Sequence, residues 1–254
     1  MTLHPFAAAL IEGIARAIEE QDDLLRSTAL VVAEKVRSGG VLHVFGSGHS
    51  HLITEELFTR AAGVTFISPV FDPALMVTGG YERSTRTERL HGYAEAVLAG
   101  ADLREHDIVL IVSNSGRNAV PVEAALFSRK RGCFVIGLTS VQHSASVESR
   151  HRSGKKLADV VDVVLDSHAP AGDAVLEVGQ SGDRYGPTST ILGAAVAHTL
   201  LCLVVEELVR LGEEPPVLRS ANLDDSDNVN ALRKARYVGR IPGLGGPAHP
   251  TTAE

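Results

Sequence analysis

The N-terminal part of the chain has the apolar spacing of an amphipathic helix. Apolar residues recur every four positions from Phe6 to Ile18, and the apolar stripe continues to Val36. This period matches one face of an α-helix. We therefore expect helix over residues 5–37, within an N-terminal segment (1–38) suited to a dimer interface.

Beyond this segment, short apolar runs alternate with longer stretches of helical period. The short runs are rich in Val, Ile and Leu, which is typical of buried strands, and they cover residues 41–45, 64–68, 108–112, 133–138 and 160–165. The helical patterns cover about 50–62, 88–98, 119–131 and 191–211. Strands that alternate with helices predict a parallel sheet covered by helices on both faces. We expect loops over 69–87 and a partly irregular C-terminal extension over 213–254, ending in a disordered tail.

Three polar turns follow or precede these elements. Gly46-Ser47-Gly48-His49-Ser50 follows the first strand, Ser113-Asn114-Ser115-Gly116-Arg117-Asn118 follows the third, and Pro187-Thr188-Ser189-Thr190 opens the last helix. In parallel sheets, ligands bind beyond the carboxyl ends of the strands, near a topological switch point. N–H groups at a helix start, together with hydroxyl side chains, form a seat for a phosphate or another small oxyanion. The turns therefore predict a phosphorylated small molecule as the ligand.

Composition argues against several other classes of function. Hydrophobic residues make up 44% of the 254 residues and charged residues 22%, as in soluble globular proteins. The net charge is −7 and Lys and Arg form no dense stripe, so we expect no nucleic-acid partner. We find no apolar run near the roughly 20 residues that span a bilayer, and no signal peptide. We therefore expect no membrane partner and a cytoplasmic location.

Together the three turns resemble those of the SIS (sugar isomerase) domain family, over roughly residues 39–211. The turn at 46–50 is similar to the Gly-x-Gly-x-Ser loop of phosphoheptose isomerase and arabinose-5-phosphate isomerase. The turn at 113–118 resembles the Ser-x-Ser-Gly-x-Thr/Asn phosphate loop shared with the isomerase domain of glucosamine-6-phosphate synthase. The turn at 187–190 resembles the Pro-Thr/Ser-Ser-Thr turn of several members. The whole sequence resembles most a bacterial group of stand-alone SIS proteins often labelled phosphoheptose isomerase-like.

The resemblance implies a fold and an assembly. The fold would be an α/β three-layer αβα sandwich of flavodoxin- or Rossmann-like topology, with a five-stranded parallel sheet and additional N-terminal helices. Residues 39–212 would form the SIS domain. SIS domains usually pair, and their sites often borrow residues across the interface, so a homodimer or homotetramer is expected.

The resemblance also implies which side chains bind the substrate. The phosphate would be held by Ser113, Asn114, Ser115 and Asn118. Ser47, His49 and Ser50 would contact sugar hydroxyls or the phosphate, and Thr188 and Ser189 would close the site.

One feature of phosphoheptose isomerase is not preserved. That enzyme carries a zinc His and Glu on the helix after the first turn, and these positions fall on Glu56 and Arg60 here. Its Gln and His ligands on the last helix are eight residues apart, and alignment on His198 places Thr190 where the Gln would be. We therefore carry over no metal site and expect no cofactor.

Isomerisation of an aldose to a ketose needs a base that moves a proton between C1 and C2, and groups that stabilise the enediolate. Our candidates for this chemistry are His51, Glu55 and Glu56. His51 and Glu55 are four residues apart and would share a helix face as an oriented pair. The alternative for the two glutamates is a surface or dimer salt bridge, and for His51 hydrogen bonding within the loop.

Three further residues have two interpretations each. His168 and Asp173 follow the last predicted strand and would either reach the ligand or cap their loop. His198 lies on an apolar helix, where a core or interface role is the simpler interpretation.

The sequence thus predicts a phosphosugar-binding protein, with aldose–ketose isomerisation through an enediolate as its leading activity. A lyase of the N-acetylmuramic acid-6-phosphate etherase type, which shares the fold, is one alternative. A non-catalytic sugar-phosphate sensor is the other, although such sensors usually carry a DNA-binding module and no basic helix-turn-helix pattern precedes residue 39.

Overall fold

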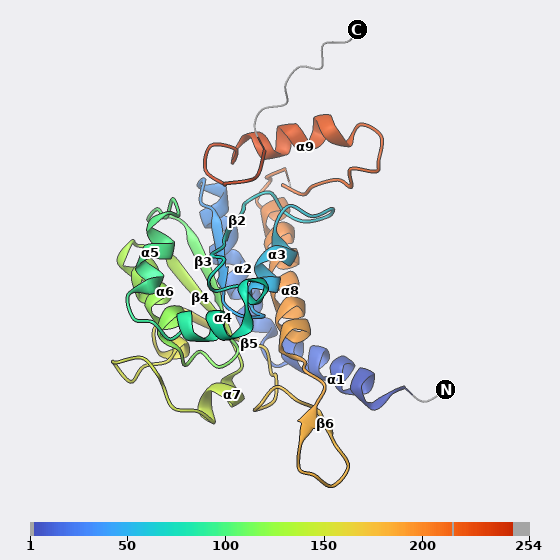
Figure 1. Cartoon of the computed structure of the whole chain (residues 1–254). Coiled ribbons are helices and arrows are strands. Elements are labelled where there is room, and N and C mark those ends of the chain that lie inside the picture. Colours follow the sequence, from blue (N-terminus) through green and yellow to red (C-terminus); the bar gives the residue numbers. More distant parts are fainter. Residues whose placement is uncertain (1–2, 215, 246–254) are drawn as a thin grey trace.

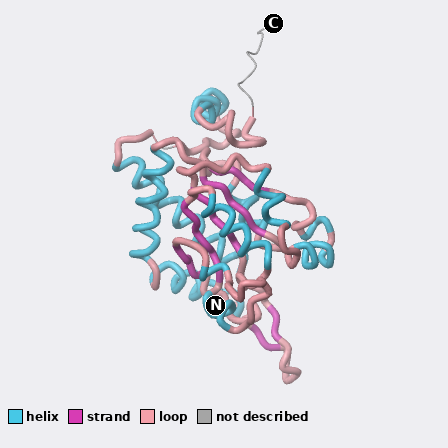
Figure 2. The backbone as a smooth tube through the Cα atoms, turned by 90° about the vertical axis from the view of Figure 1, so that its left-hand side faces the viewer, coloured by secondary structure: helices cyan, strands magenta, loops and turns pink. Residues whose placement is uncertain are grey.

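A parallel sheet of five strands lies at the centre of the molecule (Figures 1 and 2). The structure is a computed structural model that describes residues 3–214 and 216–245. In spatial order the strands are β2 (Ile67–Val70), β1 (Leu42–Gly46), β3 (Ile108–Val112), β4 (Phe134–Thr139) and β5 (Val163–Asp166). Every residue of β1 and β3 is buried, which explains their continuous apolar sequence.

Helices cover both faces of this sheet (Figure 1). On one face lie α2 (Asp22–Arg37) and the long α8 (Ser189–Arg210), flanked by α1 (Pro5–Glu19) and α3 (His51–Leu57). On the other face lie α5 (Tyr93–Ala99) and α6 (Ala119–Lys130). The remaining elements are short: α4 (Tyr81–Thr87), α7 (Val141–Ala145), α9 (Ser226–Ala235), 3₁₀ turns at Val77–Gly79 and Leu157–Asp159, and a hairpin of β6 (Leu176–Glu177) and β7 (Arg184–Tyr185). The predicted three-layer fold with a five-stranded parallel sheet is confirmed.

Helix α8 is long and apolar enough to cross a membrane by length and composition alone. The expectation that no apolar run approaches the length of a membrane span was therefore wrong for this stretch. In the structure, eight of its residues are buried, and the helix packs on α2, α1 and α3. Its apolar composition is therefore that of a central core helix.

Tertiary contacts explain where the element boundaries differ from the prediction. The predicted helix 5–37 is two helices, because the Gln21 side chain turns to the backbone of Asp166, the last residue of β5, and donates to its carbonyl. The strand expected at 64–68 begins at Ile67, because Val64 pairs instead with Val217 of the C-terminal extension.

Between β2 and β3 the helices lie earlier and later than expected. Residues 81–87, expected as loop, form α4, whereas the helix expected from residue 88 begins at Tyr93. Gly92, with φ of 83°, separates the two helices in a left-handed conformation that favours glycine. Residues 88–92, between the two helices, therefore belong to neither helix.

The C-terminal extension packs against the amino ends of the strands, opposite the polar turns. Its Tyr237, Ile241 and Leu244 are buried in the same core as α2 and α8. The far end of the extension, residues 246–254, for which disorder was expected, lies outside the described residues.

A buried carboxylate joins this extension to the sheet. Asp107, just before β3, receives hydrogen bonds from Arg240 of the extension, from His43 and from the N–H groups of Val41 and Arg104. Burial alone would raise the pKa of the Asp107 carboxyl, but these donors outweigh it and hold the pKa well below its usual range. Asp107 is therefore ionised in the folded protein at neutral pH.

We predict that Asp107→Asn lowers the free energy of unfolding by about 3 kcal/mol, because it leaves Arg240 without its buried partner. Because the folded-state pKa of Asp107 is depressed, its contribution is full above the unfolded-state pKa of roughly 3.9 and is lost as the pH falls below that value. Urea unfolding at pH 7 and pH 3 measures both effects. Asp102→Asn, in an exposed ion pair with Arg104 and Arg240, should cost less than about 1 kcal/mol. Equal losses for the two variants would contradict this account.

Candidate functional site

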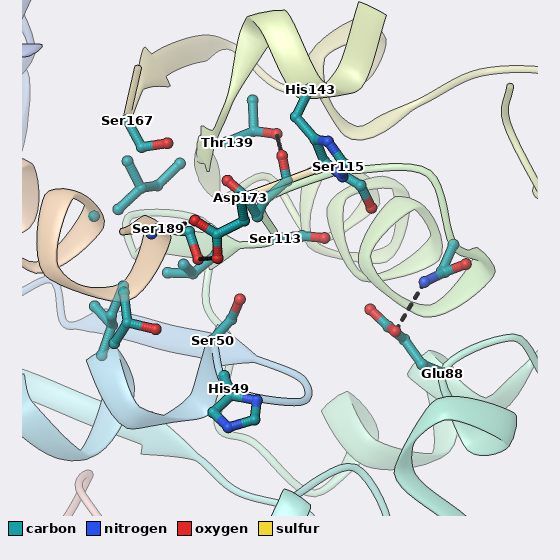
Figure 3. A pocket seen from close by; sticks show the side chains of 17 residues that line it. His49, Ser50, Glu88, Ser113, Ser115, Thr139, His143, Ser167, Asp173 and Ser189 are labelled. Carbon is teal, nitrogen blue, oxygen red and sulfur yellow. Dashed lines mark hydrogen bonds between the residues drawn. The ribbon is translucent and has the colours of Figure 1, made fainter. Parts of the chain in front are cut away.

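A polar pocket lies at the carboxyl edge of the sheet, where β1 and β3 are neighbours and the chain leaves them in opposite directions (Figure 3). This is the switch point of a doubly wound sheet, the usual place for a ligand. Five loops supply its polar lining: His49 and Ser50 after β1, Ser113, Asn114, Ser115 and Asn118 after β3, Thr139 and His143 after β4, Ser167 and Asp173 after β5, and Ser189 and Thr190 at the start of α8. Glu88 completes the wall.

The turn after β3 is fixed by its carbonyl groups. The carbonyl oxygens of Asn114, Gly116 and Arg117 accept hydrogen bonds from the N–H groups of Ser140, Leu157 and Arg150, respectively. These carbonyl oxygens are thus occupied and would not repel an incoming anion. The hydroxyl groups of Ser113 and Ser115 line the pocket beside the start of α6. This arrangement suits a phosphate.

Gly116 is required by the shape of this turn. Its φ is +59°, and a Cβ atom there would lie 3.0 Å from the Cβ of Leu157. The N–H of Gly116 donates to Ser113 Oγ at 3.2 Å, which closes the turn. The small residue thus lets the loop fold tightly against Leu157.

Glu88 is the acid that lines the pocket beside this turn. Its carboxylate accepts a hydrogen bond from Ser47 Oγ at 2.7 Å and another from Asn118 Nδ2 at 2.8 Å. Burial raises the pKa of the Glu88 carboxyl above its usual range, against the lowering effect of these two donors and of Arg150. A carboxylate directed into a pocket with a raised pKa is suited to proton transfer.

His143 supplies a second titratable group. Its Nδ1 accepts a hydrogen bond from the Gly172 N–H at 2.9 Å, so the neutral ring carries its proton on Nε2. Burial lowers the pKa of His143, and Arg117 adds to this, against the opposite effect of Asp173. The ring is thus neutral at pH 7 and presents an N–H donor.

Asp173 occupies the N-terminus of α8. Its carboxylate accepts hydrogen bonds from the N–H and hydroxyl groups of both Thr188 and Ser189, at 2.6–3.2 Å. The residue adopts φ of +55° to reach this position. The donors of Thr188 and Ser189, predicted to close on the substrate, are therefore engaged by a carboxylate of the same chain, and Thr188 itself is buried.

The residues predicted in the first turn have different places. His49 and Ser50 line the pocket, as the prediction requires of substrate-binding groups. Ser47 is buried behind them and acts on the pocket through its hydrogen bond to Glu88.

The predicted base candidates lie outside the pocket lining. His51 is buried, with Nδ1 on the Gly48 carbonyl and Nε2 3.4 Å from Glu55 Oε1. Glu55 is half-exposed on the outer side of α3. Glu56 forms ion pairs with Arg60 and with His198, whose Nε2 is 3.2 Å from Glu56 Oε1. Within one chain, Glu55 and Glu56 therefore form surface ion pairs, which was the alternative interpretation of these two residues.

Two titratable residues of the pocket, Glu88 and His143, were absent from the predicted set, as were the hydroxyl residues Thr139 and Ser167. Glu88 precedes its loop partner Asn118 by 30 residues and belongs to no recognised turn. The sequence offered one sign of its role, namely an acid between Arg86 and Arg89. This stretch, however, lies at the boundary between the predicted loop and the predicted helix.

The fold and the pocket define an α/β protein with hydroxyl groups beside a helix start and a carboxylate of raised pKa at the switch point of a doubly wound sheet. Residues 5–140, more than half of the chain, match the family model of the SIS domain. A UPF0309 protein of Halalkalibacterium halodurans is 41% identical over 233 residues, which cover 91% of this chain and 93% of the relative. A UPF0309 protein of Listeria innocua is 40% identical over 236 residues, with 93% and 94% covered. The chain belongs to the SIS domain family, in its UPF0309 group.

Two solved structures are similar to this chain. A "putative phosphosugar isomerase involved in capsule formation" from Bacteroides fragilis is 21% identical, with a TM-score of 0.51 over 82% of this chain and 91% of that one. A phosphoheptose isomerase from Francisella tularensis is 16% identical, with a TM-score of 0.49 over 78% of this chain and 94% of that one.

We predict that Ser115→Ala weakens the binding of a phosphorylated sugar at least tenfold, because a hydrogen bond to a charged group contributes about 1.5–3 kcal/mol. Calorimetric titration with the tightest ligand from a panel of pentose, hexose and heptose phosphates measures this. Ser27→Ala is the matched control, because the Ser27 hydroxyl is exposed and bonds only to the carbonyl of Leu24 in its own helix. Unchanged affinity in a folded Ser115→Ala protein would refute the phosphate seat.

Proposed function

We propose that this protein is a sugar-phosphate aldose–ketose isomerase in which Glu88 moves the proton between C1 and C2. The observation that carries the proposal is that a carboxyl group with a raised pKa shares one pocket with the hydroxyl groups of Ser113 and Ser115 beside the start of α6. Membership of the SIS family supports the choice of ligand, because SIS domains bind phosphosugars.

The phosphate is assigned to the turn at 113–118. Ser113 and Ser115 donate hydroxyl hydrogen bonds, and the dipole of α6 favours the negative charge. In a protein with a net charge of −7, such local donors have to supply the attraction. With the phosphate held there, the opposite end of the sugar lies toward the Glu88 and His49 side of the pocket.

Glu88 is assigned the proton transfer. As carboxylate it takes the C2 proton of the aldose, which leaves an enediolate, and as carboxylic acid it returns the proton to C1 of the ketose. The proton on O2 passes to O1 to complete the isomerisation. Because Ser47 and Asn118 hold the carboxylate from both neighbouring loops, its orientation is fixed before the substrate arrives.

His143 and Ser50 are assigned to the developing negative charge on the sugar oxygens. The neutral His143 ring offers its Nε2–H, and Ser50 offers a hydroxyl, and both line the pocket. Donors fixed in place before the reaction stabilise such charge without the reorganisation that water would need.

We predict that the protein catalyses deuterium exchange at C2 of at least one sugar phosphate in heavy water. Glu88→Gln should lower the exchange rate by a factor of about 100 or more, the usual contribution of a general base. Glu95→Gln, an exposed acid in the first turn of α5, is the matched control and should retain full exchange. Proton nuclear magnetic resonance across the panel of sugar phosphates measures both rates. Exchange by Glu88→Gln at the rate of the wild type would contradict the role of Glu88.

The stability of Glu88→Gln separates a lost base from a lost fold. Because the folded-state pKa of Glu88 is raised, ionisation costs folding free energy, and this cost grows as the pH rises through the folded-state pKa. Glu88→Gln should therefore unfold at the same temperature as the wild type, or higher, at pH 7. Binding of sugar phosphates without exchange of any of them would favour the non-catalytic sensor, and release of lactate from N-acetylmuramic acid 6-phosphate would favour the lyase.

A further inference from the structure

Three side chains with metal-binding atoms meet next to the pocket but outside its lining. His91 follows α4, Glu123 lies on α6, and His151 lies in the loop after α7. Glu123 Oε1 is 3.0 Å from His91 Nδ1 and 3.6 Å from His151 Nε2. All three donor atoms lie within 4.8 Å of one another, and the two imidazole centroids are 5.2 Å apart.

These separations suit a single small cation. A tetrahedral Zn²⁺ with bonds of about 2.0–2.1 Å has neighbouring donor atoms roughly 3.3 Å apart. The two shorter separations, 3.0 and 3.6 Å, lie on either side of this value. Two imidazole nitrogens and one carboxylate oxygen form a donor set typical of zinc and other divalent transition metals.

Backbone and hydroxyl groups orient two of the three donors. The second carboxylate oxygen of Glu123 accepts a hydrogen bond from the Gly92 N–H at 2.6 Å. His151 Nδ1 lies 2.7 Å from Ser153 Oγ and accepts a hydrogen bond from the Ser153 N–H at 3.3 Å, so Nε2 gives up its proton when it binds a metal. Such outer contacts are a regular feature of metal sites.

The cluster is reachable and can accept the added charge. The side chain of His91 is 34% exposed, whereas His151 is 6% exposed, so an ion would enter past His91. Arg152 Nη2 lies 3.5 Å from Glu123 Oε1 and would repel a cation at that distance. Its side chain is 69% exposed, however, and can turn into the solvent.

The position of the cluster connects it to the pocket. Asn118 donates a hydrogen bond to Glu88 and accepts one from Arg150 at 3.0 Å, so these three side chains form a hydrogen-bonded row. Each residue of the metal-binding cluster lies a few positions after one residue of this row in the sequence. His91 comes three residues after the first, Glu123 five after the second, and His151 directly after the third. An ion on the cluster would therefore tie together the three segments that hold Glu88.

We propose that His91, Glu123 and His151 bind one divalent transition metal ion, Zn²⁺ by geometry, which fastens the three segments around Glu88. The ion sits outside the pocket lining and takes no part in the chemistry of the sugar. Metal binding is independent of the proposed isomerase activity, and its test needs no sugar.

The test uses the full-length protein and Zn²⁺ itself. The protein is dialysed against a chelator, equilibrated with graded Zn²⁺, and its bound metal is measured by mass spectrometry. We expect about one ion per chain for the wild type and at least a tenfold loss of affinity for His91→Ala and for Glu123→Gln. His106→Ala, an exposed histidine elsewhere on the surface, should bind as the wild type does. Wild-type binding no tighter than that of Glu123→Gln would overturn the site.

Hydrogen exchange tests the fastening role. Zn²⁺ should slow amide exchange in residues 88–92 and 150–152 of the wild type, but not of His91→Ala. Because His91 is the most exposed of the three residues, its variant should fold even where His151→Ala does not. Stoichiometric binding of Zn²⁺ without slower exchange in either segment would overturn the fastening role.

Discussion

The carboxylate of Glu88 is the group on which the arrangement of the pocket depends. Carboxylates that leave water need hydrogen-bond donors, and Glu88 finds them in Ser47 after β1 and Asn118 after β3. These two loops are the ones that diverge at the switch point of the sheet. The Glu88 backbone carbonyl also accepts from the Val120 N–H at the start of α6. One residue from a connecting segment thus fixes the distance between the two turns that face the ligand.

Two carboxylates at opposite edges of the sheet illustrate opposite electrostatic solutions. Asp107, at the amino end of β3, has two cationic or potentially cationic partners and two backbone donors, and its pKa is depressed. Glu88, at the carboxyl end, has two neutral donors, and burial raises its pKa. The first arrangement stabilises the ionised form and joins the C-terminal extension to the core. The second raises the pKa of a proton acceptor, which costs stability but suits proton transfer.

The sequence predicted those parts of the fold that depend on residues close together in the chain. The apolar runs at β1 and β3, the turn with Gly116 and the helix after it were predicted within a residue or so, because burial on both faces and left-handed glycine leave a plain pattern. The boundary of β2 was misplaced because Val64 pairs with a residue more than 150 positions later in the chain. No local pattern carries that information.

The same distinction applies to the pocket. His49, Ser50 and the Ser113–Asn118 turn could be placed at the ligand edge from the sequence, because they directly follow strands of a parallel sheet. Glu55 and Glu56 were chosen for closeness in sequence to the first turn, yet the rotation of α3 directs them toward His51, Arg60 and His198. Glu88 could not be found this way, since its place depends on how the segment between β2 and β3 folds back over both turns.

A crystal structure of the protein with a sugar phosphate bound would test the central claim most directly. The account predicts the phosphate against the hydroxyls of Ser113 and Ser115 at the start of α6, with C1 and C2 of the sugar within about 3.5 Å of the Glu88 carboxylate, the separation at which bound groups react. A phosphate seated elsewhere, or a sugar whose C1 and C2 face away from Glu88, would contradict it.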